Sequence, residues 1–303
     1  MFSGIGIAAL ALAGVAFAFW TSTDSSNPAV AVADSIQAGS TPTLGGINGQ
    51  DVNLNWTATT TVAGASVSGY TVNRYSVASG GTPTAATGGC TGTIAALTCT
   101  EQSVPAGTWY YAITPKISLW SGAESGRLST TVVAASFSVT ASQQVRATAN
   151  VTGGSIAHFN NSETVVFHLD TAAGTTMTGG VSAVNSSGSA SGFTVTVPAG
   201  TAQGSHTIVA VGGSGSQATS NSFNVDNTAP VTTDNTASIG SGWFNTTKTV
   251  TLTPTDSGGA GVAATYYTTD GSTPTISSSQ GTSIVLSTDG VYTIKYFSVD
   301  NAG

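Results

Sequence analysis

Short runs of alternating apolar and polar residues recur along most of the chain. In one of them, "DVNLNWTA", Val52, Leu54 and Trp56 alternate with three polar residues. Alternation of this kind predicts a strand with one buried face. Runs like this return about every dozen residues and are separated by Gly, Ser, Asn and Pro, which is typical of β-sandwiches. No amphipathic helical stretch follows Ala33, so the pattern predicts an all-β fold of tandem sandwiches.

The first 33 residues differ from the rest. The stretch from Gly4 to Trp20 is a continuous apolar run of about the length that crosses a bilayer. It contains Ala16-Phe17-Ala18, a small-x-small site that would allow cleavage after Ala18, although no Lys or Arg precedes the run. We expect residues 1–33 to be a signal peptide or a helical membrane anchor, and the protein to be secreted or attached to the cell surface. The stretch also resembles signal regions of Gram-positive matrix-fibre and surface proteins.

A first β unit is predicted over residues 41–136. Its strands are "DVNLNWTA", "GYTVNRYSV", "GTWYYAITPKI" and "RLSTTVVAA". The order of an early strand with an inward Trp, a Tyr-x-Val strand and an aromatic-rich strand resembles a fibronectin type III domain. We therefore expect Trp56 to be the core tryptophan of a sandwich and not a ligand platform.

The chain has two cysteines, Cys90 and Cys99, both in this first unit. A disulfide between them would close a short loop and contribute on the order of 2–3 kcal/mol. The alternatives are a zinc site, which needs further ligands, and two free thiols. No histidine lies in this unit, and an even cysteine count in a secreted chain favours the disulfide.

A second β unit is predicted over residues 137–226. Its segments "NVTGGSIAHFNNSETVVFHLD" and "VPAGTAQGSHTI" resemble the short immunoglobulin-like repeats of bacterial surface proteins. Alternation places Val165, Phe167 and Leu169 on one face of a strand. All three histidines of the chain lie in this unit (His158, His168 and His206). No pair has the i, i+4 spacing of a helical metal site, so solvent-facing histidines are favoured over a metal site.

The segment "NVDNTAPVTTDN" separates the second unit from the third. Pro230 and its flanking residues predict a short extended linker. Asp226 and Asp234 raise the hypothesis of a calcium ion held at the linker, because calcium takes several oxygen ligands. A solvated hinge without any metal or other cofactor is the preferred interpretation.

A third unit is predicted over residues 228–303. It contains Gly-Trp at 242–243, "TDSGGAGV", "TYYTTDGSTPT" and "GVYTIKYFSVDNAG". Together these resemble the immunoglobulin-like modules related to the C-terminal domain of chitobiase. The resemblance implies a repeat of bacterial surface and secreted proteins, with catalysis confined to a separate barrel domain that these residues do not contain. It also implies a packing role for Trp243, and a module that normally continues beyond Asn-Ala-Gly as part of a longer array.

Asp270 lies before a glycine in the middle of "TYYTTDGSTPT". Glycoside hydrolysis would need a second carboxyl group facing it across a sugar. Asp270-Gly271 and Asp289-Gly290 both sit between strand-like runs, where Asp bonds its own backbone and Gly supplies a positive φ. We therefore interpret Asp270 as a turn residue. In the following strand, alternation predicts that Tyr292, Ile294 and Tyr296 share the core-facing side, joined by Tyr266 or Tyr267.

Composition excludes several function classes. Charged residues make up only 6% of the chain, and its net charge is −7 with six Lys and Arg residues. A protein that neutralises phosphates needs a basic face, so nucleic acid and an anionic membrane surface are unsuitable partners. The chain also lacks G-x-S-x-G with matching partners, H-E-x-x-H and a P-loop. We expect no enzyme activity within these residues.

Two functions remain. The first is a non-catalytic structural or adhesive stalk of a bacterium, extracellular or attached to the cell surface. The alternative is the spacer or carbohydrate-binding region of a larger polysaccharide-active enzyme, in which exposed Trp120 and Trp243 would stack on sugars. Cell-wall or extracellular polysaccharide and surface proteins are the partner classes to consider, and the sequence does not choose among them.

Overall fold

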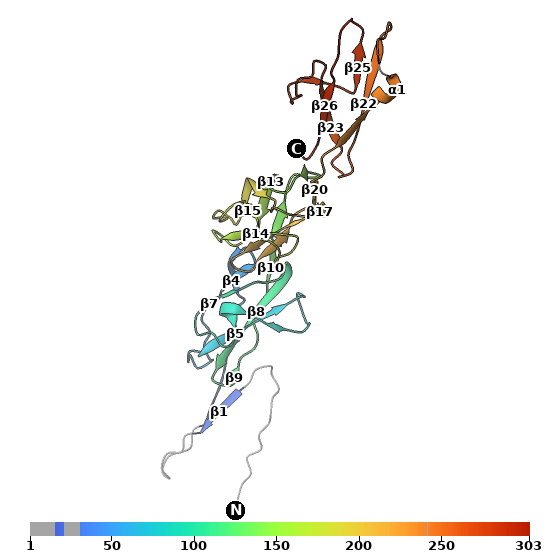
Figure 1. Cartoon of the computed structure of the whole chain (residues 1–303). Coiled ribbons are helices and arrows are strands. Elements are labelled where there is room, and N and C mark those ends of the chain that lie inside the picture. The colour runs from blue at the N-terminus through green and yellow to red at the C-terminus, as the bar shows by residue number, and fades with distance from the viewer. Residues whose placement is uncertain (1–15, 21–30, 241) are drawn as a thin grey trace, which may run out of the picture. The chain divides into compact units, whose positions relative to one another are not determined.

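The computed structural model describes residues 16–20, 31–240 and 242–303 (Figure 1). Within these residues the protein is all-β, as the periodicity predicts. The helical elements of the described part are one four-residue helix, α1 (Thr236–Ile239), and one 3-10 turn, η1 (Gly88–Cys90). The strands therefore carry the architecture.

Part of the N-terminal apolar run is described, and it is a strand. β1 (Ala16–Trp20) pairs antiparallel with β2 (Ala31–Ser35). The helical conformation expected for Ala16–Trp20 is wrong, because this backbone pairs with a neighbouring strand. The signal or anchor role stays a prediction, and the rest of the expected helix lies outside the described residues. None of the helices in the described part is long and apolar enough to cross a membrane.

The chain groups into two compact units. Unit 1 runs to Ala135 and also includes His158–Asn161 and Ser214–Ser216; unit 2 contains the remaining residues from Ser136 to Gly303. Unit 1 has one sheet in the order β3 (Thr43–Asn48), β4 (Asp51–Asn55), β7 (Thr98–Glu101). Its second sheet has the order β10 (Leu128–Val132), β8 (Gly107–Ile117), β5 (Gly69–Tyr75), β6 (Thr84–Ala85), with β9 (Trp120–Ser121) paired to β8.

A single hydrophobic core joins the two sheets of unit 1. It contains Val52 and Leu54 of β4 together with Tyr111 and Ile113 of β8, all fully buried. The alternation predicted for "DVNLNWTA" is therefore confirmed. Trp56 belongs to the same core and meets Tyr70 edge-on, with ring centroids 5.5 Å apart. Its predicted core role is also confirmed.

Unit 2 begins with sheets that we call the middle segment (136–225). The first sheet has the strand order β11 (Ser136–Ser138), β13 (Asn150–Ala157), β16 (Ala190–Thr196), β15 (Thr178–Gly179). The second has the order β12 (Gln144–Val145), β20 (Phe223–Val225), β17 (Gly204–His206). The third has the order β14 (Val165–Leu169), β18 (Ile208–Gly212), β19 (Gln217–Thr219). Phe137, Phe167 and Phe193 form an aromatic cluster with ring centroids 5.2–6.1 Å apart. Val165 and Phe167 are buried on one face of β14, as predicted.

Unit 2 ends with two sheets that we call the C-terminal segment (231–300). Their orders are β21 (Val231–Asp234), β22 (Lys248–Thr255), β25 (Ser283–Leu286); and β24 (Ser279–Gln280), β23 (Val262–Thr268), β26 (Lys295–Asp300). Their core contains Val250, Leu252 and Ile284.

Three residues of the predicted aromatic face pack on this core. They are Tyr267, Ile294 and Tyr296. The face predicted from alternation is confirmed for Ile294 and Tyr296, and Tyr267 is the earlier tyrosine that joins them. Tyr266 instead stacks on Phe297, with centroids 5.4 Å apart, because neighbouring residues of a strand point to opposite faces.

The described strand pairs agree with a modular organisation. After β2, each pair joins strands within 43–132, within 136–225 or within 231–300. The middle and C-terminal segments nevertheless belong to one compact unit. The predicted domain boundaries at 41–136, 137–226 and 228–303 stay a prediction.

Candidate functional site

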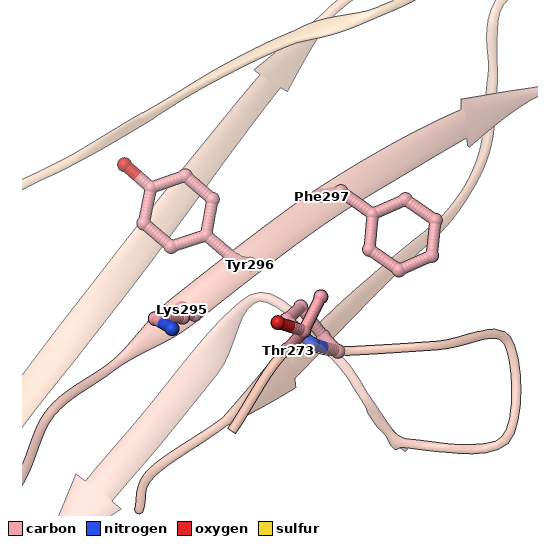
Figure 2. Close-up of a pocket in the computed structure, with 5 residues that line it drawn as sticks. Thr273, Lys295, Tyr296 and Phe297 are labelled. Carbon is pink, nitrogen blue, oxygen red and sulfur yellow. The ribbon is translucent and has the colours of Figure 1, made fainter. Parts of the chain in front are cut away.

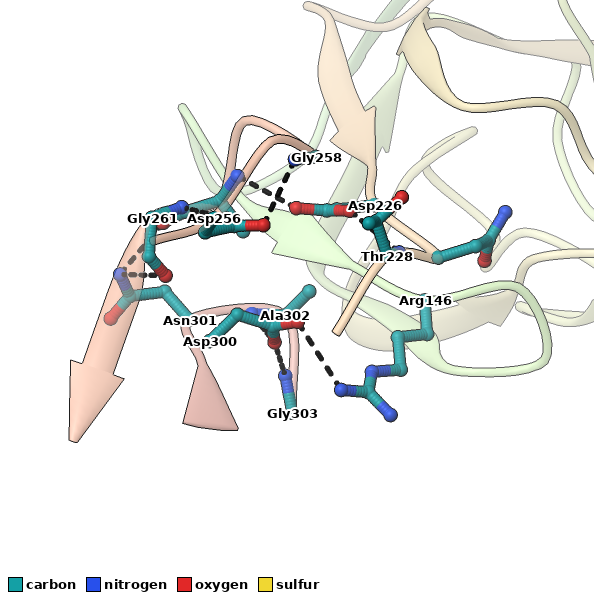
Figure 3. Close-up of polar contacts among 12 residues, drawn as sticks. Arg146, Asp226, Thr228, Asp256, Gly258, Gly261, Asp300, Asn301, Ala302 and Gly303 are labelled. Atoms are coloured by element: carbon teal, nitrogen blue, oxygen red, sulfur yellow. Dashed lines mark hydrogen bonds and ion pairs between the residues drawn. The ribbon is translucent and has the colours of Figure 1, made fainter. Parts of the chain in front are cut away.

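Three aspartates lie where the middle and C-terminal segments of unit 2 meet (Figure 3). Asp226 follows β20, Asp256 follows β22, and Asp300 is the last residue of β26. Asp226 is 1% exposed and Asp300 is 3% exposed. Burying a carboxylate is costly unless hydrogen bonds or an opposite charge compensate it, so their partners matter.

Backbone N–H groups satisfy the first two carboxylates. Asp226 Oδ1 accepts from the Thr228 N–H at 2.9 Å, and Asp226 Oδ2 accepts from the Ala260 N–H at 2.8 Å. Asp256 accepts from the Gly258 N–H at 2.9 Å and from the Gly261 N–H at 2.6 Å. Each oxygen of the two carboxylates therefore has a backbone donor.

Asp300 combines backbone donors with a cation. Its Oδ1 accepts from the Ala302 and Gly303 N–H groups, both at 2.9 Å. Its Oδ2 accepts from Arg146 Nη2 at 3.2 Å, and the Asp300 side chain is completely buried in this ion pair. The arrangement fixes loops in place and leaves the carboxylates engaged in structural contacts.

The structure does not bring the two predicted calcium ligands together. Asp234 accepts from the Thr236 N–H at 2.8 Å and from the Tyr296 hydroxyl at 2.6 Å, and it shares none of the partners of Asp226. Over the described ranges, no three His, Cys, Asp or Glu residues lie together in a group that could hold a metal ion. The preferred solvated hinge is wrong for Asp226, because this side chain is buried and bonds across the junction.

Asp234 and Tyr296 shift each other's titration. The hydrogen bond from the Thr236 hydroxyl, and then the one from Tyr296, lower the pKa of Asp234 below its ordinary value. The hydrogen bond to Asp234, together with burial, raises the pKa of Tyr296. Both shifts favour the charged carboxylate bonded to a neutral tyrosine, which joins β21 to β26.

A shallow depression of about 460 Å³ lies beside β26 (Figure 2). It is lined by Thr273, Pro274, Lys295, Tyr296 and Phe297. Figure 2 shows the Tyr296 and Phe297 rings on opposite sides of the strand, and each ring already packs on its own neighbours. Lys295 is the one charged residue of the lining, so the depression offers a contact surface without an acid–base pair.

Asp270 holds a turn. Its Oδ1 accepts from the Ser272 N–H at 2.9 Å and from the Ser272 hydroxyl at 2.6 Å. The bond from the Ser272 side chain is the largest cause that lowers the pKa of Asp270. Gly271 has φ +82°, so the turn interpretation is confirmed at this position. The same expectation is wrong for Gly290, which has no positive φ.

The two candidate sugar-stacking tryptophans are both exposed. Trp120 in β9 is 47% exposed, and Trp243, between α1 and β22, is 92% exposed. The packing role expected for Trp243 is therefore wrong. Its neighbour Phe244 contacts Lys248, whose Nζ lies 4.6 Å from the centre of the Phe244 ring. Sugar stacking by either tryptophan stays a prediction.

Cys90 and Cys99 form the predicted disulfide. Their Cα atoms are 5.2 Å apart, and both residues belong to the hydrophobic core of unit 1. The bridge ties η1 to β7. The free-thiol and zinc alternatives are therefore wrong, because both sulfur atoms are used in the bond.

The remaining sequence candidates have local roles. His206 Nδ1 lies 2.8 Å from Asp170 Oδ2, and His168 Nδ1 lies 3.1 Å from the Gly174 carbonyl oxygen. His158 lies just beyond β13 with φ +63°. Ala18 lies in β1, and cleavage after it stays a prediction.

The C-terminal segment matches a known family model. Residues 239–303 match the chitobiase/beta-hexosaminidase C-terminal domain. The resemblance of "TYYTTDGSTPT" and its neighbours to this family is confirmed. A comparison with curated proteins found no match.

A comparison with solved structures found matches that extend over most of the chain. The FN1–FN3 domains of chicken CNTN1 are 12% identical and cover 88% of this chain and 95% of theirs, with a TM-score of 0.28. A Bacteroides ovatus protein, SGBP-B of a mixed-linkage glucan utilization locus in complex with a heptasaccharide, is 16% identical and covers 85% and 59%, with a TM-score of 0.24. A tetra-tandem repeat from the extending region of a large adhesion protein is 16% identical and covers 92% and 71%, with a TM-score of 0.24. Such TM-scores place no constraint on function.

Sequence reasoning missed most of the junction. It singled out Asp226 but paired it with Asp234, and it did not select Arg146, Asp256 or Asp300. One signal was present: the pattern Phe-x-Val-Asp-Asn occurs at 223–227 and again at 297–301. In both copies the aspartate accepts the N–H two residues later, so the repeated pattern marks two related turns.

Proposed function

We propose that this chain is a non-catalytic stalk of a bacterial secreted or surface-attached protein, built from tandem β-sandwich modules. The observation that carries the proposal is the use of buried carboxylates at the junction in unit 2. The carboxylate oxygens of Asp226 and Asp300 accept hydrogen bonds from loop N–H groups and from Arg146, and these contacts hold successive sheets together. Such a design suits a protein that spans distance.

Two further observations support a non-catalytic role. The acid at the exposed tip, Asp270, is engaged in its own turn with Ser272. The matched family model at 239–303 is named for the C-terminal domain of chitobiase and beta-hexosaminidase. In the proposed account, this segment serves as an accessory module.

A hydrolase screen of the purified full chain tests the absence of catalysis. Chromogenic glycosides, esters and peptides would be incubated with the chain and with a heat-unfolded sample of it. The account predicts the same background rate in both samples. Turnover that depends on the folded chain would contradict it, and a loss of that turnover in Asp270→Asn would assign the activity to this acid.

The extracellular location is supported by the disulfide, because such bonds persist in oxidising compartments. Expression of the chain with its N-terminal segment in a bacterial host would test this, followed by fractionation and intact mass. We expect the chain outside the cytoplasm with the disulfide formed. A chain found only in the cytoplasm would contradict the proposal, and a mass matching cleavage after Ala18 would identify a signal peptide.

The alternative, a carbohydrate-binding or spacer region of a larger polysaccharide-active enzyme, is favoured by one observation. Trp243 is 92% exposed, which is unusual for a large aromatic side chain and suits stacking on a sugar ring. A glycan array would test it with Trp243→Ala and, as a matched exposed control, Val291→Ala. Binding lost only in Trp243→Ala would support carbohydrate binding, and an array without any binding would contradict it.

A further inference from the structure

The first part of the linker between the middle and C-terminal segments is held by hydrogen bonds. β20 ends at Val225 and β21 begins at Val231, so residues 226–230 join them. Asn227 Oδ1 accepts from the Ala147 N–H at 2.9 Å, and Asn227 Nδ2 donates to the Thr201 carbonyl at 3.0 Å. Pro230 fixes its own φ. These contacts restrict the linker from the side of the middle segment.

Two contacts cross the junction in opposite directions. Asp226, the first residue of the linker directly after β20, accepts the N–H of Ala260 in the loop between β22 and β23. Asp300, from the end of the C-terminal segment, accepts from Arg146 in the loop between β12 and β13 (Figure 3). The buried carboxylate that follows the last strand of the middle segment therefore bonds to the C-terminal segment, and the one at the end of the C-terminal segment bonds to the middle segment.

The loop 258–261 is shaped to fit Asp226. A Cβ atom at Gly258 would collide with the Asp226 carboxylate, so only glycine allows this approach. Gln203 Nε2 donates to the Gly258 carbonyl at 2.7 Å, and Gln203 Oε1 accepts from the Thr228 hydroxyl at 2.6 Å. Gln203 thus ties the middle segment, the linker and the loop to one another.

Loss of either crossing contact leaves a buried charge without its partner. Movement of the segments away from each other would remove the Ala260 N–H from Asp226 and Arg146 from Asp300. Both carboxylates would then need water, which costs free energy while they remain buried. The crossing contacts consequently oppose bending at the linker. An apolar contact of the same size would restrict the angle between the segments less, because it does not depend on the direction in which its groups point.

We infer that Asp226 and Asp300 form a reciprocal lock that makes the middle and C-terminal segments move as one rigid body. The lock consists of the Asp226–Ala260 and Asp300–Arg146 contacts with Gln203 beside them. The repeated Phe-x-Val-Asp-Asn pattern supplies both carboxylates, each with one oxygen fixed by its own turn and the other aimed across the junction. The lock sets a fixed angle between two modules of the chain, whether or not the stalk proposal holds.

Distance measurements between spin labels in the full chain test the lock. Cysteines introduced at Val166 in β14 and Val285 in β25, both exposed, would carry the labels, since the native cysteines are in a disulfide. We expect a narrow distance distribution. Asp226→Asn replaces one carboxylate oxygen by an NH2 group, so either the Thr228 or the Ala260 N–H loses its acceptor. The double variant Asp226→Asn with Arg146→Gln should widen the distribution at least twofold.

Further variants keep the result interpretable. The single variants Gln203→Ala and Arg146→Gln change side chains that are exposed or half-buried, so both should fold even if the double variant does not. Each single variant should also widen the distance distribution. Asp289→Asn in the same segment is the matched control and should leave the width unchanged. A broad distribution in the unmodified chain, or a width that no lock variant changes while circular dichroism shows intact sheets, would overturn the inference.

Discussion

Arg146 Nη2 donates to Asp300 Oδ2 at 3.2 Å, although the two residues are 154 positions apart in the sequence. The Arg146 side chain is 40% exposed, whereas that of Asp300 is fully buried. Removal of the arginine therefore leaves a buried carboxylate with backbone donors on one oxygen only. Removal of both the Arg146 and the Asp300 charge should lower the free energy of unfolding by less than the sum of the two single losses, because neither charge is then left without its partner.

A double-mutant cycle measures this coupling. We predict that Arg146→Gln and Asp300→Asn each lower the free energy of unfolding by about 1–3 kcal/mol, with a coupling energy of about 1 kcal/mol between them. Urea unfolding followed by circular dichroism gives the four values. The same cycle on Lys295→Gln and Asp289→Asn, for which no mutual contact is seen, should be additive. Additivity of the Arg146 and Asp300 pair would show that the ion pair contributes nothing specific.

The Asp234–Tyr296 hydrogen bond makes the C-terminal segment sensitive to pH at both ends of the range. Asp234 has a lowered pKa in the folded protein. Its contribution to the free energy of unfolding is therefore present above the pKa of about 4 in the unfolded chain, and it is lost as the pH falls through the pKa in the folded protein. Tyr296 has a raised pKa in the folded protein. Its contribution to the free energy of unfolding is therefore present below the pKa of about 10 in the unfolded chain, and it is lost as the pH rises through the pKa in the folded protein.

Tyr296→Phe removes the hydroxyl group and should weaken both dependences. We predict that it raises the pKa of Asp234 toward its ordinary value and lowers unfolding free energy near neutral pH by about 1 kcal/mol. An NMR titration of the Asp234 carboxyl carbon measures the first effect. Tyr292→Phe is the control, because Tyr292 bonds to Thr288 and not to Asp234. An unchanged Asp234 titration in Tyr296→Phe would contradict the assigned cause.

The disulfide stabilises unit 1 through the short loop that it closes. The double variant Cys90→Ala with Cys99→Ala should lower the free energy of unfolding by about 2–3 kcal/mol. Differential scanning calorimetry would locate the loss in the transition of unit 1, with the transition of unit 2 unchanged. Mass spectrometry before and after reduction should differ by two hydrogen atoms per chain. Equal masses, or equal stability of the variant, would contradict the structural role given to the bridge.

Trp56 and Trp243 provide a contrast between a core and a surface tryptophan. Trp56 is 5% exposed in the core of unit 1, and its replacement in Trp56→Ala should cost about 3–5 kcal/mol. Trp243 is 92% exposed, and Trp243→Ala should change stability by no more than about 0.5 kcal/mol. Thermal unfolding measures both. A large loss in Trp243→Ala would restore the packing role that the structure argues against.

The features that sequence predicted correctly depend on neighbouring residues. Alternation identified the buried faces around Trp56 and Phe167, because a strand with one face in a core must place apolar residues at every second position. Asp270-Gly271 identified a turn, because Gly271 adopts a conformation that other residues avoid. In each case the cause of the structure lies within a few residues.

The junction could not be predicted in the same way. Arg146 is far from Asp300 in sequence, and Ala260 binds Asp226 through its backbone N–H, which every residue except proline carries. Contacts of this kind cannot be recognised from the type of residue at either position. The packing role expected for Trp243 was wrong for a related reason: a family pattern shows which residue recurs, whereas the exposure of that residue depends on which loops lie beside it.

Stretching single molecules of the full chain tests the stalk account most directly. A stalk of separately cored β modules should resist force and then yield in discrete steps, each releasing on the order of 25–30 nm for a module of roughly 70–90 residues. We predict at least two such steps in every complete trace. A smooth extension without force peaks, or one step that releases the whole chain, would contradict the central claim that these modules act as a mechanical spacer.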